Sequence, residues 1–352
     1  MSSGSSLFGM GFLIFALVNP SLGLTYDSMD YLAASESADT YFSGRNPDHI
    51  TYLHRPPLLP AYLYLFSDKA TACWWLNLLS YATSLWLCLK IGKSLRATGF
   101  FLYAPMVVVA LSLQWLQNHF FLWTEPLFTT LTLLLAYSLI EDKKLVSVVA
   151  ICMAAFLLRK SGLFLGAGAC VWYVLKKNMR SSAILGAVML LSFGLWEYVI
   201  YYFSGVSTSL NILTGLSPLS RWPYADVLTS WWLPKVIPLI YRLILIVLFI
   251  LAWILLQPPW VKSYLKNPKV QLLWILILTY VLCYIVFFGA PDYHEAERYL
   301  SVTLPLVMIV FFTFFNELIN RMSSERKRKI ITAGIAVWCL YPLARTVRYF
   351  FL

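Results

Sequence analysis

Charged residues are scarce in this 352-residue chain, where Asp, Glu, Lys and Arg together make up 12% of the sequence. Soluble domains carry about a quarter of their residues as charges, so the scarcity excludes an ordinary soluble protein. The six cysteines include no C-x-x-C pair, which argues against a disulfide framework or a cysteine metal site. The chain also lacks internal repeats, low-complexity tracts and any stretch polar enough for a separate soluble domain.

Apolar residues take the place of the missing charges, at 60% of the sequence with a mean hydropathy of +0.71. Since about 20 apolar residues in a helix cross a bilayer core, we predict an all-α polytopic membrane protein with about eleven transmembrane helices. All of residues 1–352 form one domain in this interpretation. The apolar runs are 7–25, 70–89, 97–116, 122–140, 145–158, 161–175, 182–203, 236–257, 270–289, 299–319 and 330–344. Two of them, 145–158 and 161–175, are short enough to be half-spans or one broken pair.

The distribution of charge predicts how the chain is oriented. With a cytoplasmic N-terminus, Lys and Arg cluster in every inner loop, at 90–96, 143–144, 176–180, 262–269 and 321–329, while most acidic residues fall outside. This topology and contact with anionic membrane lipid explain the net charge of +11 better than nucleic acid does, because the basic clusters are short and lack interleaved aromatics. We therefore predict a multi-pass protein of the cell membrane. Its first apolar run is retained as a helix rather than removed as a signal peptide.

Two long outer segments, 26–69 and 204–235, and a shorter one at 290–298 lie on the same predicted side. Long ordered loops usually carry function. The first contains "YDSMDYLAAS", where Asp27 and Ser28 can cap a helix over about 28–42 and Asp30 lies in its first turn. Helical spacing places Asp27, Asp30, Tyr31 and Ala34 on one face. A helix cap with a dipole-matched acid explains the same residues equally well.

Three further stretches place ionisable groups at the same outer level. "YLHRPPLLPAYLYLF" predicts an interfacial segment with His54 and Arg55 at headgroup height, although both residues also suit a lipid-facing anchor. "WTEPLFTTLTLLLAYSL" opens a span with Glu125 and a proline, and a helix-start carboxylate is the simpler explanation there. "LLRKSG" places Arg159 between two apolar runs, where ionisable groups are costly and tend to be functional.

The last outer loop, "APDYHEAERYLSVTLPL", places His294, Glu295 and Arg298 at the start of a helix, and Arg298 has the planar fork that suits a phosphate. In the second outer loop, "SRWPYADVLTSWW" offers Trp222 to stack on a sugar and Asp226 to bond its hydroxyls. An interfacial aromatic belt explains those tryptophans equally well.

Taken in order, these motifs resemble the membrane-embedded glycosyltransferases of the GT-C superfamily, which includes protein O-mannosyltransferases and the lipid A aminoarabinose transferase. The matching stretches are "YDSMDYLAA", "HRPPLLPAYLYL", "TEPLFTTLTLLLA", "LLRKSGLFL" and "ERYLSVTLPLV", and their order holds across nearly the entire chain. Each motif alone is common in membrane proteins, but five in register are specific.

The resemblance implies that a sugar moves, with inversion, from a polyprenyl-phosphate-linked donor to an acceptor hydroxyl on the extracytoplasmic face. Asp27 matches the family position of the base. The neighbouring acid that relatives often carry is here Ser28, so Asp30 is a rival to Asp27. Glu125 matches a second acid that supports the acceptor or a metal.

For the donor phosphate, the resemblance implies Arg159 and Arg298, with Arg55 and His54 as further candidates. Tyr31, Trp222, Asp226 and His294 are candidates for substrate binding. A lipid- or glycan-linked acceptor is expected. The sequence requires no cofactor. Binding of a divalent metal is left open, with His294 and Glu295 as candidate ligands.

Two other functions compete with this prediction. A transporter or flippase of a lipid-linked substrate needs ionisable groups at mid-membrane, for which Glu197 is the best candidate, but it also favours repeated halves that are absent from the sequence. An outer-leaflet glycan ligase or polymerase also uses long outer loops and arginine-bound lipid phosphates.

Overall fold

The computed structural model of the protein describes residues 23–36, 55–204, 222–233, 235–255, 259–287 and 293–351. Throughout these ranges the regular structure is helical, apart from an isolated bridge between Gly23 and Phe121. The helices are α2 (Tyr26–Ala34), α5 (Leu58–Tyr64), α6 (Lys69–Ser94), α7 (Gly99–Ala110), α8 (Leu113–Phe120), α9 (Glu125–Ile140), α10 (Leu145–Leu158), α11 (Gly162–Leu175), α12 (Met179–Ser204), α14 (Trp222–Ser230), α15 (Leu239–Leu255), α16 (Pro259–Leu265), α17 (Pro268–Phe287), α18 (Tyr293–Leu300), the 3₁₀ turn η3 (Ser301–Thr303), α19 (Leu304–Asn320), α20 (Glu325–Trp338) and α21 (Leu340–Phe351).

Five helical segments of the described chain are long and apolar enough to cross a membrane. They are Lys69–Ser94, Met179–Phe203, Pro268–Phe287, His294–Asn320 and Glu325–Arg348. The protein is therefore a helical membrane protein, as the composition predicts. Every apolar run predicted after the first contains a helix, but α9, α10, α11 and α15 are shorter than a full span, and run 7–25 lies almost entirely outside the described residues. The predicted number of eleven spans thus stays a prediction.

One predicted span is bent. Run 97–116 forms α7 and the start of α8, which meet at an angle of 52° and count as a sixth span only when taken together. The backbone leaves the helix at Ser112, whose ψ of 124° is extended. The bend ends the apolar α7 and directs the more polar α8, with Gln114 and Asn118, toward the interior of the protein.

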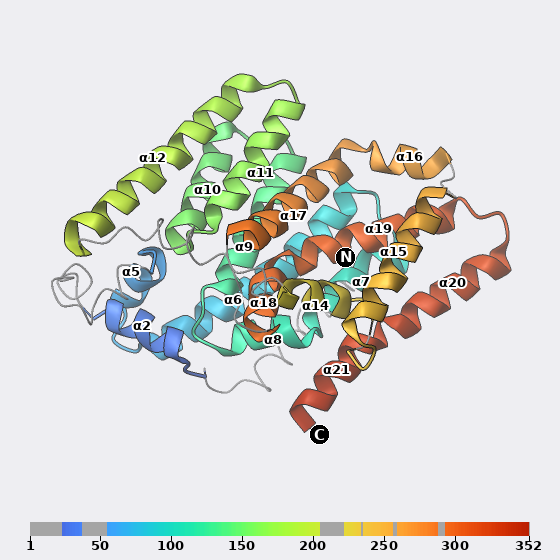
Figure 1. The fold of residues 1–352 in the computed structure, drawn as a ribbon, viewed down its shortest axis with the longest axis horizontal. Helices are drawn as coiled ribbons and strands as arrows, with labels where there is room; N and C mark the ends of the chain where they lie inside the picture. The colour runs from blue at the N-terminus through green and yellow to red at the C-terminus, as the bar shows by residue number, and fades with distance from the viewer. Residues whose placement is uncertain are drawn as a thin grey trace.

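In Figure 1, α6, α7, α9 and α19 lie toward the centre of the molecule, and α12 lies at its rim. Helix α6 packs on α9, and α19 packs on α7, around fully buried side chains such as Trp115, Phe128 and Phe312. At the rim, α12 leaves Leu190, Leu191 and Leu195 exposed. Exposed leucines on a long apolar helix suit contact with lipid, so α12 belongs to the lipid-facing surface.

The short helices α10 and α11 form a tight hairpin. Each has 14 residues, or about 21 Å, which is less than the about 30 Å of a bilayer core. Gly162 makes the turn possible, because a Cβ at this position would lie 2.3 Å from the backbone nitrogen of Phe156. The hairpin holds Arg159 in its turn, between the two helices.

The first outer segment forms α2 and α5, with residues 37–54 outside the described part. Helix α2 spans Tyr26–Ala34 rather than the predicted 28–42, so it begins and ends earlier and Asp30 lies beyond its first turn. Its cap is Thr25, whose side chain and backbone exchange hydrogen bonds with Ser28 in a capping box, rather than Asp27. Asp27 is therefore in the first turn, where its carboxylate is not used as the cap and points away to other partners.

Candidate functional site

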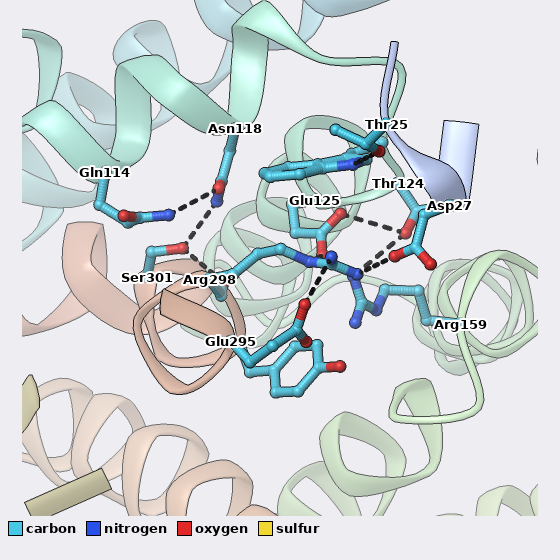
Figure 2. Close-up of polar contacts among 12 residues, drawn as sticks. Thr25, Asp27, Gln114, Asn118, Thr124, Glu125, Arg159, Glu295, Arg298 and Ser301 are labelled. Atoms are coloured by element: carbon cyan, nitrogen blue, oxygen red, sulfur yellow. Dashed lines mark hydrogen bonds and ion pairs between the residues drawn. The ribbon is translucent and has the colours of Figure 1, made fainter. Parts of the chain in front are cut away.

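The predicted site residues from five separate stretches meet in one cluster of ion pairs, which we call the acid–arginine cluster. It contains Asp27 and Asp30 of α2, Arg55, Glu125 of α9, Arg159 of the α10–α11 turn, and Glu295 and Arg298 of α18. Figure 2 shows Arg298 and Arg159 approaching Glu125 and Asp27 from opposite sides. The cluster joins segments far apart in the sequence, since Asp27 bonds Arg298 at a sequence separation of 271.

Arg298 lies at the centre of the acid–arginine cluster. Its Nε donates to Glu125 Oε1 at 2.6 Å, Nη2 to Asp27 Oδ2 at 2.6 Å, and Nη1 to Glu295 Oε1 at 3.2 Å. The guanidinium also lies over the ring of Trp123, 4.6 Å from its centroid. Each nitrogen thus bonds a different carboxylate. The planar guanidinium of arginine allows this arrangement, whereas the ammonium group of lysine does not reproduce it.

Arg55 forms the more open edge of the cluster. Its Nη2 bonds both acids of α2, Asp27 and, at 2.9 Å, Asp30. The guanidinium also lies 5.4 Å from the ring centroid of Tyr31, which is buried. Asp27, Asp30 and Tyr31 therefore share one face of α2, as the helical spacing predicts.

Arg159 closes the opposite edge. Its Nη1 bonds Glu125 and donates to Thr124 Oγ1 at 3.1 Å. The rings of Phe128 and Tyr299 lie 5.9 and 5.4 Å from the guanidinium carbon. Glu125 thus receives two arginines, which outweighs the explanation of this acid as a plain helix-start carboxylate.

Burial is lowest at the Arg55 edge of the cluster and highest at Glu125. The side chains of Arg55 and Asp27 are 25% and 19% exposed, whereas that of Glu125 is 1% exposed. Burial alone would raise the pKa of Asp27, but the charges of Arg298 and Arg55 outweigh it and hold this pKa below its usual value. Asp27 is consequently an ionised carboxylate at neutral pH, at the accessible edge.

Ser28 has a structural role at the position where the resemblance expects an acid. Its hydroxyl donates to the carbonyl of Leu122 at 3.2 Å and completes the capping box with Thr25. Trp123 Nε1 donates to Thr25 Oγ1 at 2.9 Å. These bonds attach the start of α2 to the segment before α9, and so fix Asp27 relative to Glu125.

A chain of buried polar side chains supports Arg298 from behind. Gln114 donates to Asn118 at 3.2 Å, Asn118 donates to Ser301 Oγ at 2.7 Å, and Ser301 donates to the carbonyl of Arg298 at 2.7 Å (Figure 2). These side-chain hydrogen bonds link α8 to the junction of α18 and η3. They hold the backbone of Arg298 in place, which is the usual role of such supporting bonds.

Several predicted residues are not part of the acid–arginine cluster. Asp226 pairs with the buried Arg242 and so ties α14 to α15, while Trp222 is 55% exposed at the start of α14. His294 is on α18 but contributes to a separate cavity. His54 lies outside the described residues.

Other contributors were missed by sequence reasoning. Trp123 and Tyr299 stack on the arginines and sit beside Glu125 and Arg298 in the quoted motifs, so adjacency in sequence was an available signal. Asn118 had no such signal, because its partner Ser301 is 183 residues away.

The structure bears on two other predictions, the transporter acid and the metal site. Glu197, the acid expected of a transporter, pairs with Lys160 at 3.1 Å and so is not an isolated mid-span charge. Within the described part of the chain, no group of three or more His, Cys, Asp or Glu side chains is arranged to hold a metal ion.

Comparisons with protein-family models, with curated proteins and with solved structures find no match to this chain. Its function is therefore argued from the acid–arginine cluster itself.

Proposed function

We propose that the protein is an integral membrane glycosyltransferase that transfers a sugar from a polyprenyl-phosphate-linked donor to an acceptor hydroxyl. The observation that carries the proposal is the convergence of Asp27, Glu125, Arg159 and Arg298 in one cluster. Each of these residues belongs to a different sequence motif. The proposal includes about eleven spans, a cytoplasmic N-terminus and a cluster that faces the extracytoplasmic side of the cell membrane.

In the proposed reaction, the acceptor hydroxyl attacks the anomeric carbon of the donor and Asp27 accepts its proton. The bond between the anomeric carbon and the phosphate oxygen breaks, and polyprenyl phosphate leaves with the electron pair. Inversion follows from this single displacement. Asp27 suits the role of base because it is ionised and lies at the accessible edge of the cluster, where an acceptor can reach it.

The arginines suit the leaving phosphate. Arg159 uses Nη1 for its contacts with Glu125 and Thr124, so Nη2 is its candidate donor to a phosphate oxygen. Arg298 is already shared among three carboxylates. A phosphate that attracts Arg298 or Arg55 would weaken their hold on Asp27, and the pKa of Asp27 would rise toward its usual value. Donor binding therefore makes Asp27 a stronger base when the proton must be taken.

The test is sugar transfer by membranes that contain the wild-type protein, supplied with a panel of radiolabelled polyprenyl-phosphate sugars and lipid extract as acceptor. Membranes with an equal amount of folded Asp27→Asn protein are the matched control. We expect one donor to be consumed only by the wild type. If no donor in the panel is consumed by protein shown to be folded, a ligase or a transporter of lipid-linked substrate replaces the proposal.

A further inference from the structure

A second charged cavity, of about 370 Å³, lies beside α18 and does not include the acid–arginine cluster. This volume is at the lower end of small-molecule pockets, which span about 300 to 1,000 Å³. The lining residues are Leu113, Gln117, Lys235, His294, Glu297, Arg345 and Arg348. They come from four places in the chain: α8, the α14–α15 linker, α18 and α21.

Helix α18 separates the two sites. Glu295 bonds Arg298 in the acid–arginine cluster, whereas Glu297 bonds Arg345 at 2.6 Å in the second cavity. Two residues along a helix correspond to a rotation of about 200°, so these two acids point in nearly opposite directions. Opposite faces of one helix thus serve two distinct charged sites.

The second cavity has an excess of positive charge. Among the residues that line it, Lys235, Arg345 and Arg348 are cations and Glu297 is the one carboxylate. Glu297 is 3% exposed at its side chain and is neutralised by Arg345. The nearby acid Asp226 is neutralised by Arg242. The Lys, Arg and Glu side chains of the lining therefore have a formal net charge of about +2.

Helix α21, which carries two of these cations, is held in position by the protein. Arg345 and Arg348 are three residues apart and share one face of the helix. On either side of Arg345, Tyr341 donates to the carbonyl of Ser230 at 3.3 Å, and Thr346 donates to the carbonyl of Leu111 at 2.6 Å. These bonds attach α21 to the rest of the protein, so the cationic face is organised before a ligand arrives.

We propose that this cavity binds a phosphate monoester. A dianionic phosphate matches the net charge of the lining better than a carboxylate does, and arginine pairs form charge-assisted bonds with phosphate oxygens. Gln117 and His294 supply further hydrogen-bonding groups at the same cavity. The phosphate belongs either to a small soluble ester or to a lipid headgroup. The inference goes beyond the proposed function, since it requires no sugar donor and no transfer.

The test is thermal unfolding of the purified full-length protein in neutral detergent, followed by tryptophan fluorescence. Glycerol 3-phosphate is the soluble probe, and sodium chloride at equal ionic strength is its control. Phosphatidic acid in mixed micelles is the lipid probe, and phosphatidylcholine is its control. We expect a concentration-dependent rise in the unfolding temperature with one phosphate probe and no rise with its control. The probe that acts identifies the source of the phosphate.

Variants connect the effect to the cavity. Arg348→Gln and Lys235→Gln should each weaken binding about tenfold or more, because each removes a charge-assisted hydrogen bond to the phosphate. Arg326→Gln removes an exposed cation of α20 and should not change binding. Arg345→Gln is avoided, since it would leave Glu297 buried without its partner, but Glu297→Gln should tighten binding by releasing Arg345. The inference is overturned if neither phosphate probe exceeds its control, or if Arg326→Gln weakens binding as much as Arg348→Gln.

Discussion

Arg298 and Glu125 are 173 residues apart in the sequence and are joined by a 2.6 Å bond between Nε and Oε1, in the most buried part of the acid–arginine cluster. The contact connects the start of α9 with α18. Because Glu125 also bonds Arg159, this one carboxylate holds the turn of the α10–α11 hairpin and α18 together.

Loss of Arg298 should destabilise the protein. Arg298→Ala leaves Glu125 buried with one partner fewer and removes the bond to Asp27, and breaking a buried ion pair costs about 3 to 5 kcal/mol. Arg321 is the matched control, because it pairs with Glu317 at an exposed site where such a pair contributes about 1 kcal/mol or less. Denaturant unfolding in mixed micelles measures both variants. Equal destabilisation by Arg298→Ala and Arg321→Ala would contradict the structural importance of the cluster.

The two acids of α2 should differ in their contribution to catalysis. Asp27 bonds both Arg55 and Arg298, whereas Asp30 bonds Arg55 at the open edge. We expect Asp27→Asn to lower the rate of sugar transfer by about 10²- to 10⁴-fold, as loss of a general base does. Asp30→Asn should lower this rate by about tenfold or less, because it weakens only the positioning of Arg55. Transfer assays at matched amounts of folded protein distinguish them, and the reverse order would make Asp30 the base.

The pH dependence of stability follows from the lowered pKa of Asp27. A carboxylate with a native pKa below its unfolded value, about 3.8, stabilises the fold fully above that value. The contribution disappears as the pH falls through the lower native pKa. We therefore expect the difference in unfolding temperature between wild type and Asp27→Asn to be constant from about pH 5 to 7 and to shrink below about pH 4. A difference that changed between pH 5 and 7 would place the pKa of Asp27 above its usual value.

Gly162 should be intolerant of a side chain. Gly162→Ala introduces a Cβ that meets backbone atoms of Ala155 and Phe156, so the α10–α11 hairpin must open and move Arg159. We expect a loss of about 1 to 3 kcal/mol, typical of overpacking. Gly194→Ala in α12 is the control, since nothing lies within 4 Å of its Cβ and alanine favours a helix by up to about 1 kcal/mol.

Thermal unfolding of the two glycine variants, together with the transfer assay, separates a packing effect from an effect on the site. If Gly162→Ala is as stable and as active as Gly194→Ala, the hairpin does not position Arg159 by close packing.

The sequence by itself determined the class of the protein and the identity of most cluster residues. Its low charge and long apolar runs require a helical membrane protein, because backbone polar groups in lipid must be satisfied within helices. The costly placement of Arg159 between two apolar runs marked this residue. Asp27, Glu125 and Arg298 were marked by their places at the outer ends of predicted spans.

Only the tertiary structure decided which charges meet. Arg298 and Arg159 share Glu125, Asp226 instead joins Arg242, and Glu197 joins Lys160. Helical periodicity sets which residues share a face, but the pairing depends on how distant helices pack. The same reason explains why the bend between α7 and α8, the support of Arg298 by Asn118, and the second cavity beside α18 could not be read from local pattern.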